Sequence, residues 1–510
     1  MVAFENQSGD AALDWQGRAL ADGITLALTG APRSAAVYAP ALADAFASRP
    51  THVVHGYISK GGRAYAAVED AATHRMVAEA SAAVRSAAAM ATELARQIDA
   101  SARSLNISAE ALRAFSEGDF ERAAAVEPAF GAAYVAWANA SIARGDRASA
   151  EKAIAAGSAR RLGIGALERA QLQLAAARLL GDRAVTRRAL LLIARSAPAD
   201  PAAFRALGAI DTGMRSFANA ARWYDDAIAR DPDPELYNSA AYVRAYGGDL
   251  EGAESRIEQY RRLRPNEANP LDSRGEIHYH LGLFAQAERD FLASYEKDPS
   301  FLGGAALYKA AWARLRTGDL AGADAHLARY LKTVPGERAA VLQAQWEFVT
   351  GRRKQAFARL ADAPEPVAAA HLAVFALESG NRAMAAAYAA RVPGRSPAGA
   401  ALRLVLAPDS QDAAGPAADL ARGYAAMLAG RPRDAARSFS GLLDAAPPGS
   451  ADGPEVLLAW ALIESGRPEE ARPLLAHNPI PDASADHPFL PLIYPRLLEL
   501  RHRLGMAQSR

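Results

Sequence analysis

The sequence predicts a mostly α-helical protein, an α-solenoid of stacked helical hairpins that follows a small α/β domain. One helix-turn-helix pattern recurs between residues 201 and 335, with a turn glycine, an alanine soon after it and a closing proline. The turn residues Gly248, Gly282 and Gly318 are 34 and 36 residues apart, a spacing typical of helical-hairpin repeats. Before residue 76, apolar residues instead alternate with a period of two, which favours paired strands.

Composition and charge narrow the class of protein. With 510 residues the chain exceeds one ordinary globular core, and 58 Lys and Arg balance 57 Asp and Glu, so no net charge indicates nucleic acid as a partner. The absence of cysteine excludes disulfides and thiolate metal sites. No stretch approaches the about 20 apolar residues of a membrane span, and the first residues lack a secretory pattern. A cytoplasmic protein is predicted, or a periplasmic one if the true start lies upstream.

Residues 1–76 are predicted to form the small α/β domain. Strands are expected at residues 2–4, 35–38, 52–58 and 64–68, and helices at residues 11–28 and 41–47. Gly61 and Gly62 supply the turn between the last two strands. The alanine-rich residues 77–103 are predicted to be a helix that links this domain to the array.

The array is predicted to run from residue 104 to the end of the chain in eleven hairpins. Their turns fall near residues 118, 145, 181, 213, 248, 282, 318, 351, 380, 430 and 466. A solenoid block covers residues 104–392, an irregular bend covers 393–416 with room for an extra helix at 399–406, and further hairpins with a capping helix cover 417–510. The second helix before Pro128 is expected to be short. The last helix, within residues 488–505, closes the final repeat or docks on another protein.

The repeat resembles the tetratricopeptide repeat (TPR) family. The residues that carry the resemblance are small, aromatic, small and proline in order, as in Gly208, Ala220, Tyr224, Ala227 and Pro232. The resemblance implies right-handed stacking of hairpins whose first helices line a concave groove. The alternative is an alanine-rich helical bundle whose glycines fall at this interval by accident.

The amino-terminal residues are similar to those of the TolB-like (FlgO-like) domain. The similarity rests on residues 4–10 (FENQSGD), 21–25 (ADGIT), 51–57 (THVVHGY) and 70–73 (DAAT). In many bacterial proteins that domain precedes TPR arrays, often behind a kinase, a cyclase or a winged-helix module. The resemblance implies an alternative function, in which the protein is the regulatory or sensor module of a signalling system and acts with a separate kinase, cyclase or transcription factor.

Candidate catalytic and metal-binding residues are few. His278 and His280 lie two residues apart on a predicted helix, about 200° around its axis, and cannot share one metal ion. His278 is expected to pack between helices, and Asp290 and His326 to be solvated charges on second helices. No serine elbow, zinc motif or phosphate loop appears. We therefore expect no enzyme activity, no metal and no cofactor, although a hydrolase site within residues 1–75 stays open.

A partner-binding groove is the favoured functional site. The TPR resemblance implies that it is lined by Arg205, Asn238, Tyr242, Tyr246, Asp272, Glu276, Tyr279, His280, Tyr308, Trp312 and Arg316. Aromatic residues are only 7% of the chain, and a concentration of them on one surface is typical of anchor residues for a protein or peptide. Alternatively, some of these rings wedge between hairpins. The sequence thus predicts a non-enzymatic adaptor or scaffold, and leaves its oligomeric state open.

Overall fold

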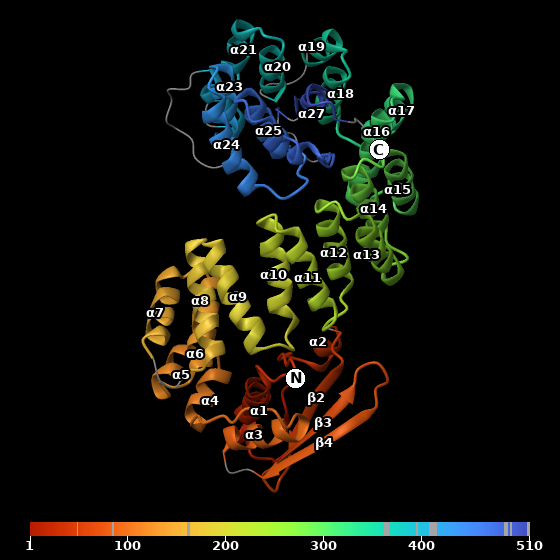
Figure 1. Ribbon diagram of the computed structural model, residues 1–510. Helices are drawn as coiled ribbons and strands as arrows, with labels where there is room; N and C mark the ends of the chain where they lie inside the picture. Colours follow the sequence, from red (N-terminus) through yellow and green to blue (C-terminus); the bar gives the residue numbers. More distant parts are fainter. Residues whose placement is uncertain are drawn as a thin grey trace. The chain divides into compact units, whose positions relative to one another are not determined.

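The computed structural model describes residues 1–47, 49–83, 86–160, 164–361, 367–393, 396–406, 416–483, 488–489 and 492–506. They form one small sheet followed by helices arranged as antiparallel hairpins (Figure 1). Contacts within the chain define two compact units, and the boundary falls inside one hairpin. The N-terminal unit comprises Met1–Ile210 and Trp223–Pro232, and the C-terminal unit comprises Asp211–Arg222 and Asp233–Arg510.

The N-terminal unit begins with a four-stranded sheet. Its strands are β1 (Glu5–Asn6), β2 (His52–Ile58), β3 (Arg63–Asp70) and β4 (Met76–Ala83), in that order across the sheet. The β1 and β2 strands are parallel and the other pairs antiparallel. Short elements η1 (Ala11–Leu13) and α2 (Leu42–Ala47) accompany the two helices that pack on the sheet, α1 (Asp14–Leu28) and α3 (Ala87–Ile98).

Three predictions for this region are wrong. The strand expected at residues 2–4 does not form, and the first strand is instead β1 at Glu5–Asn6. Residues 76–83 are the edge strand β4 and not the start of a linking helix, although alanine favours helices. Ala80 and Ala82 face the core while Val77 and Glu79 are exposed, so this stretch has the period of a strand, and pairing with β3 outweighs the alanine propensity. The strand expected at residues 35–38 is reduced to a single parallel bridge between Val2 and Ala39.

Helical hairpins complete the N-terminal unit. They are α4 (Ala109–Ser116) with α5 (Phe120–Val126), α6 (Gly131–Ala143) with α7 (Arg147–Ser158), and α8 (Ala166–Leu180) with α9 (Arg183–Ser196). The short α5 confirms the shortened second helix expected before Pro128. The hairpin of α10 (Pro201–Gly213) and α11 (Phe217–Ile228) contributes residues to both units.

The C-terminal unit continues the same arrangement. Its helices are α12 (Pro234–Tyr246), α13 (Leu250–Leu263), α14 (Asn269–His280), α15 (Phe284–Lys297), η2 (Phe301–Gly304), α16 (Ala305–Arg316), α17 (Leu320–Leu331), α18 (Gly336–Val349), α19 (Arg353–Ala361), α20 (Val367–Glu378), α21 (Arg382–Ala389), α22 (Pro397–Leu406), α23 (Pro416–Leu428), α24 (Pro432–Ala445), α25 (Pro454–Glu464), α26 (Pro468–Ala471), η3 (Pro473–Leu475) and α27 (Ile493–Arg503). The α22 helix is the extra helix expected in the bend. It contacts α20, α21 and α23, while residues 394–395 and 407–415 of the predicted bend lie outside the described residues.

Turn chemistry explains why the hairpins form where the glycines stand. Gly248 and Gly318 have φ of +78° and +90°, a region that favours glycine, and the aspartate that follows each of them caps the second helix. The exception is the α10–α11 turn, where Arg215, and not Gly213, has the positive φ of +56°. Arg215 stands five residues before Ala220, so this hairpin keeps the register of the others.

Close packing inside the hairpins depends on pairs of a glycine on the first helix and a ring on the second. These pairs are Gly208 with Tyr224, Gly275 with Phe291, and Gly423 with Phe439. A Cβ atom on any of these glycines would lie under 3.0 Å from the ring, so the ring occupies the space of the missing side chain. Together the small sheet and the hairpins confirm the predicted fold class, a TPR-like α-solenoid that follows a small α/β domain.

The last helix, α27, packs against α25 and η3. Its buried residues Ile493, Leu497 and Leu500 join the core of the final hairpins, which is the arrangement expected of a capping helix. Within the described part of the chain, no helix has the length and apolar character needed to cross a membrane.

Candidate partner-binding site

Ten of the predicted groove residues lie on three successive first helices of the C-terminal unit, namely α12, α14 and α16. We call the surface formed by these ten residues and by five residues of α18 the inner face. The residues of α18 are Arg338, Leu342, Gln345, Trp346 and Val349. The eleventh residue, Arg205, belongs to the N-terminal unit, where it forms an exposed ion pair with Asp231 at 3.3 Å. Arg205 was predicted to line the groove because it occupies the equivalent position of its own repeat.

A buried charge cluster crosses the inner face between α14 and α16. The Lys309 ammonium lies 2.7 Å from Asp272 and also contacts Glu276, and its side chain is only 6% exposed. Tyr242 of α12 donates its hydroxyl hydrogen bond to Glu276. Two carboxylates therefore share one ammonium in a region largely closed to water, which gives the cluster a formal charge of −1.

Burial changes the protonation of this cluster. It raises the pKa of Asp272 to about 6, against the opposing attraction of Lys309. Burial lowers the pKa of Lys309, but the attraction of Glu276 and Asp272 outweighs that effect and leaves the pKa above its ordinary value. The Oδ1 atom of Asp272 is buried and has no hydrogen-bond partner among the described residues. Asp272 is thus the group of this cluster whose pKa is raised to the range just below neutral pH.

A segment of the chain itself covers the end of α14. Residues 476–483, which we call the resident segment, follow η3 and form neither helix nor strand from 478 to 482. The backbone N–H of Asn478 donates to the carbonyl oxygen of His280 at 2.9 Å, and the side-chain amide donates to the carbonyls of Tyr279 and His280 at 3.3 and 3.2 Å. These carbonyls end a helix and need such donors.

Two arginines fix Asn478 from the other side. Arg316 and Arg501 donate to its Oδ1 at 3.0 and 2.9 Å. Arg501 also donates to the backbone carbonyls of Leu475 and His477, so α27 holds the resident segment at several points. Burial lowers the pKa of Arg501 to about 10, which still leaves it charged at neutral pH.

The histidine beneath the resident segment is neutral. His280 Nδ1 lies 2.8 Å from the Asn478 carbonyl oxygen, and its ring stacks on His477 at 4.8 Å. Burial, together with His477, lowers the pKa of His280 to about 3. The tautomer with a proton on Nδ1 donates to the carbonyl, and Nε2 is then an acceptor that is buried without a partner among the described residues.

A loop before α25 joins the resident segment on the inner face. The backbone N–H of Ile480 donates to the Gly449 carbonyl at 2.9 Å. Gly449 has a φ of +74°, and a Cβ atom there would lie 2.9 Å from the Tyr246 ring. Arg338 of α18 donates to the carbonyl of Ala483. The predicted groove residues Tyr246, Tyr279 and His280 are therefore in contact with the protein's own chain.

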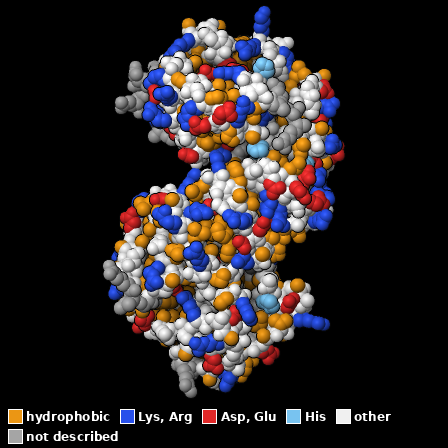
Figure 2. Space-filling model, viewed as in Figure 1, with side chains coloured by type: hydrophobic (Ala, Val, Ile, Leu, Met, Phe, Trp, Pro, Cys, Tyr) orange, Lys and Arg blue, Asp and Glu red, His pale blue; other side chains and the backbone are white. Residues whose placement is uncertain are grey.

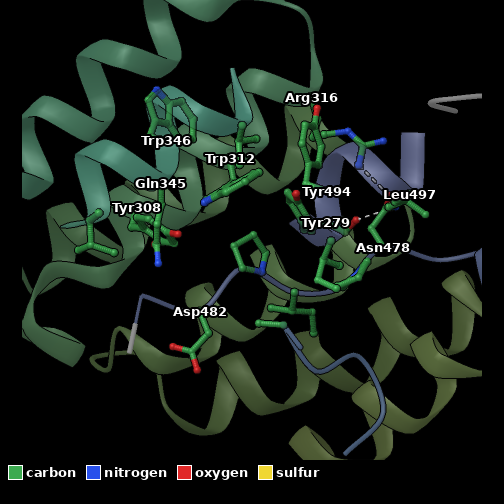
Figure 3. Close-up of a pocket in the computed structure, with 17 residues that line it drawn as sticks. Tyr279, Tyr308, Trp312, Arg316, Gln345, Trp346, Asn478, Asp482, Tyr494 and Leu497 are labelled. Carbon is green, nitrogen blue, oxygen red and sulfur yellow. Dashed lines mark hydrogen bonds between the residues drawn. The ribbon is translucent and has the colours of Figure 1, made fainter. Parts of the chain in front are cut away.

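An aromatic pocket lies beside the resident segment. Its walls include Tyr308, Trp312 and Trp346 from the array, Tyr494 from α27, and Pro479 and Pro481 from the resident segment. The space between them, part of which is open to solvent, is about 660 Å³. Figure 3 shows Trp312 between Trp346 and Tyr494, and its ring meets both edge to face at 5.3 and 5.1 Å. The indole Nε1 of Trp312 is buried without a hydrogen-bond partner among the described residues.

A second, more polar cavity adjoins the aromatic pocket. Its space, part of which is open to solvent, is about 1520 Å³, and its lining includes Glu276 and Lys309, the loop of residues 447–452 and residues 480–483. Ala451 and residues 480–482 line both cavities, so the resident segment is part of a wall that the two cavities share. The inner face thus offers an apolar site and a charged site side by side.

The other predicted polar residues form structural contacts. His278 is buried with Nδ1 2.6 Å from Asp290, which confirms that it packs between helices. Asp290 is not the solvated charge that was predicted, because it is 6% exposed and also accepts from Arg274. His326 likewise contacts Glu288 at 2.9 Å. Charged residues of the second helices are thus buried between packed helices. The sequence alone predicted that they would lie on the surface.

Other features of the described residues do not indicate a different site. No group of three or more His, Cys, Asp or Glu side chains among them could hold a metal ion. Positive and negative side chains are interspersed over the visible face of each unit in Figure 2, in line with the balanced composition. Asp10 caps the helix that follows it, as its place in the Ser8-Gly9-Asp10 turn suggests.

Sequence reasoning missed several residues of this site. Lys309 had a detectable signal, because it stands within the apolar first part of a first helix and follows a pair of carboxylates four residues apart on the preceding first helix. Asn478 had none, since its contacts with Tyr279 and His280 join residues about 200 positions apart. Arg501 had none either, because no repeat pattern relates α27 to the resident segment. Asn238, a predicted groove residue, is partly exposed and has a buried Oδ1 without a hydrogen-bond partner in the described structure.

Comparisons with known proteins identify no family for this chain. No protein-family model matches the chain, and no curated protein matches it. Among solved structures it is similar to a chain of the structure described as "Naa15/Naa10 bound to HypK-THB", with 14% identity and a TM-score of 0.32. The match covers 78% of this chain and 65% of that one, so it spans less than two thirds of that chain. The class that fold and site define is a TPR-like helical-repeat protein with a partly filled inner face.

Proposed function

We propose that this protein is a non-enzymatic adaptor or scaffold that binds a peptide or protein segment on the inner face of its C-terminal unit. One observation carries the proposal: the inner face already holds a non-helical stretch of polypeptide, the resident segment, through hydrogen bonds to its backbone and to Asn478. A surface that binds one such stretch has the donors, acceptors and rings that a second one needs.

The partner segment is expected to lie beside the resident segment and not in its place. Asn478 is 3% exposed and fully bonded, so its removal would leave buried groups without partners. The two neighbouring cavities are open to a ligand, and they offer an aromatic pocket next to a charged site. Tyr308 and Trp312 are the anchor residues, because large rings in a desolvated pocket contribute most to protein interfaces.

A selection from a random-peptide library, followed by calorimetry, tests this function. Peptides that bind the whole protein are expected to lose about tenfold or more in affinity when Tyr308 is changed to Ala, which corresponds to about 1.4 kcal/mol or more. The matched control is Tyr388→Ala, on α21, because Tyr388 does not line either cavity. Binders whose affinity is unchanged by Tyr308→Ala and lowered by the control would place the interaction elsewhere and contradict the proposal.

We propose a second contact surface on the N-terminal α/β domain, as its TolB-like resemblance suggests for a signalling module. Tyr57 and Tyr65 are cross-strand partners that stack at 5.1 Å and are 38% and 37% exposed. They point away from the buried residues Ala64 and Ala66, so this face of the sheet carries two exposed rings. A separate kinase, cyclase or transcription factor encoded nearby is the partner that the resemblance suggests.

This second surface has its own test. The purified products of neighbouring genes are mixed with the protein and with a Tyr57→Ser, Tyr65→Ser variant, and association is measured by light scattering. Loss of association in the variant supports a regulatory role. Association that the variant leaves unchanged, or the absence of association with every neighbouring product, contradicts it.

A further inference from the structure

We propose that the aromatic pocket recognises a proline residue of the partner segment, whose backbone carbonyl accepts a hydrogen bond from Trp312 Nε1. The inference rests on the proposed function and specifies its ligand. Proline is the residue type that matches the polar groups, the shape and the charge of this pocket, as the following observations show.

One polar atom of the pocket, the indole Nε1 of Trp312, requires a hydrogen-bond acceptor. Of the described side chains that line it, Trp312 alone has a buried polar atom without a hydrogen-bond partner, and that atom is an N–H donor. The nearby Gln345 already lies 2.9 Å from His371 through its Nε2 atom. A ligand group that enters therefore gains most if it brings a carbonyl and has no N–H of its own to bury.

Proline satisfies this requirement because it lacks a backbone N–H and keeps a carbonyl. Any other residue would carry an amide hydrogen toward the aromatic corner of the pocket, and a buried donor without a partner is unfavourable. The ring also preorganises an extended backbone, which lowers the entropy lost on binding.

The shape of the pocket agrees with this assignment. The ring of Trp312 meets Trp346 at 83° and Tyr494 at 72°, so the rings stand edge to face and form a corner of flat apolar surfaces (Figure 3). Pro479 and Pro481 of the resident segment already line the same pocket. Proline rings are therefore compatible with these walls, and aromatic-lined grooves are a recurrent binding mode for proline-rich segments.

The pocket is lined by one charged side chain of each sign, Arg316 and Asp482, so its lining has no formal net charge. Arg316 is one of the lining residues, and its guanidinium lies 5.2 Å from the centre of the Tyr494 ring. A cationic ligand beside the Tyr494 ring would therefore meet this positive charge. The observations thus favour a neutral residue over a lysine or a methylated ammonium group.

Two capped synthetic peptides test the inference on the whole protein: a proline decamer and a decamer in which alternate prolines are alanine. Calorimetry is expected to give at least about tenfold tighter binding of the proline decamer. Trp312→Phe, which keeps a ring and removes the N–H, is expected to weaken that binding about tenfold, the size of one hydrogen bond of about 1.4 kcal/mol. Trp460→Phe is the matched control, because Trp460 is in the same unit and does not line the pocket.

A spectroscopic readout makes the test independent of any change in folding. The chain has six tryptophans, so an ¹⁵N-labelled sample has a small set of indole signals, and the one missing from Trp312→Phe belongs to Trp312. Addition of the proline decamer is expected to shift this signal downfield, as a new hydrogen bond requires. Equal affinity for both decamers, or an unmoved Trp312 signal at saturation, overturns the inference.

The outcome separates this inference from the proposed function. Library peptides without proline that still depend on Tyr308 would leave the inner face as the binding surface and overturn the proline assignment alone. Library peptides that are unaffected by Tyr308→Ala would contradict the proposed function itself.

Discussion

Asn478 donates its backbone hydrogen bond to the carbonyl oxygen of His280 at 2.9 Å and so ties the resident segment to the end of helix α14. The resident segment therefore covers part of the predicted groove, and that part is not accessible to a partner. What stays accessible is the aromatic pocket and the charged cavity that adjoin this contact.

The Asn478 contact makes a specific prediction about stability. Asn478→Ala removes the side-chain partner of Arg316, Arg501 and the helix-end carbonyls, and the buried guanidinium of Arg501 loses one acceptor. The free energy of unfolding is expected to fall by about 2–4 kcal/mol, measured by urea denaturation of the C-terminal transition. Asn266→Ala, at an exposed position, is the control and should change it by less than about 0.5 kcal/mol. Equal effects of the two substitutions would contradict the structural role of Asn478.

The Lys309 cluster predicts an asymmetry between its members. Lys309→Met leaves the buried Asp272 and the partly buried Glu276 without their cation, and is expected to destabilise the fold by about 3–5 kcal/mol at pH 7.5. Thermal and urea denaturation check this value. Lys332→Met, at an exposed site, is the control. A loss for Lys309→Met no larger than for the control would mean that the cluster contributes nothing to stability.

The raised pKa of Asp272 predicts how stability depends on pH. The folded value of about 6 exceeds the unfolded value of about 3.9, so the folded state binds the proton more tightly and Asp272 favours folding most at low pH. That contribution is lost as pH rises through 6. Relative to the wild type, Asp272→Asn should therefore gain on the order of 3 kcal/mol between pH 4 and pH 7.5. A difference between the two proteins that stays constant over this range would refute the raised pKa.

The glycine and ring pairs predict a packing effect. Gly275→Ala places a Cβ atom 2.6 Å from the ring of Phe291, and the rigid hairpin has little room to adjust. We expect a loss of about 1–3 kcal/mol, measured by denaturation. Gly336→Ala is the matched control, because a Cβ atom there meets no atom within 4 Å and the position begins helix α18. An equal change in the free energy of unfolding for Gly275→Ala and Gly336→Ala would contradict the proposed packing of Gly275 against Phe291.

Much of the fold could be predicted because its signals are local. The positive φ of Gly248 and the cap at Asp249 are consequences of residue types that stand next to each other. The edge strand β4 could not be predicted, since Ala80 and Ala82 favour a helix by themselves and become strand residues through pairing with β3. Local preference decides where hairpins turn, and tertiary contact decides what an alanine-rich stretch becomes.

The candidate site was predictable to a lesser extent. The repeat register identified Tyr308 and Trp312, and both line the aromatic pocket. It could not reveal that the resident segment would cover Tyr279 and His280, because that contact depends on how distant hairpins fold against each other. Whether the predicted groove residues contact a partner stays a prediction.

Hydrogen–deuterium exchange of the whole protein, with and without a peptide selected from the library, tests the central claim most directly. If the partner segment binds on the inner face beside the resident segment, amide exchange should slow in α16 and in residues 477–483. It should stay unchanged in β4 and in α7. Slowed exchange confined to the N-terminal unit, or no change in α16 at saturating peptide, would contradict the account.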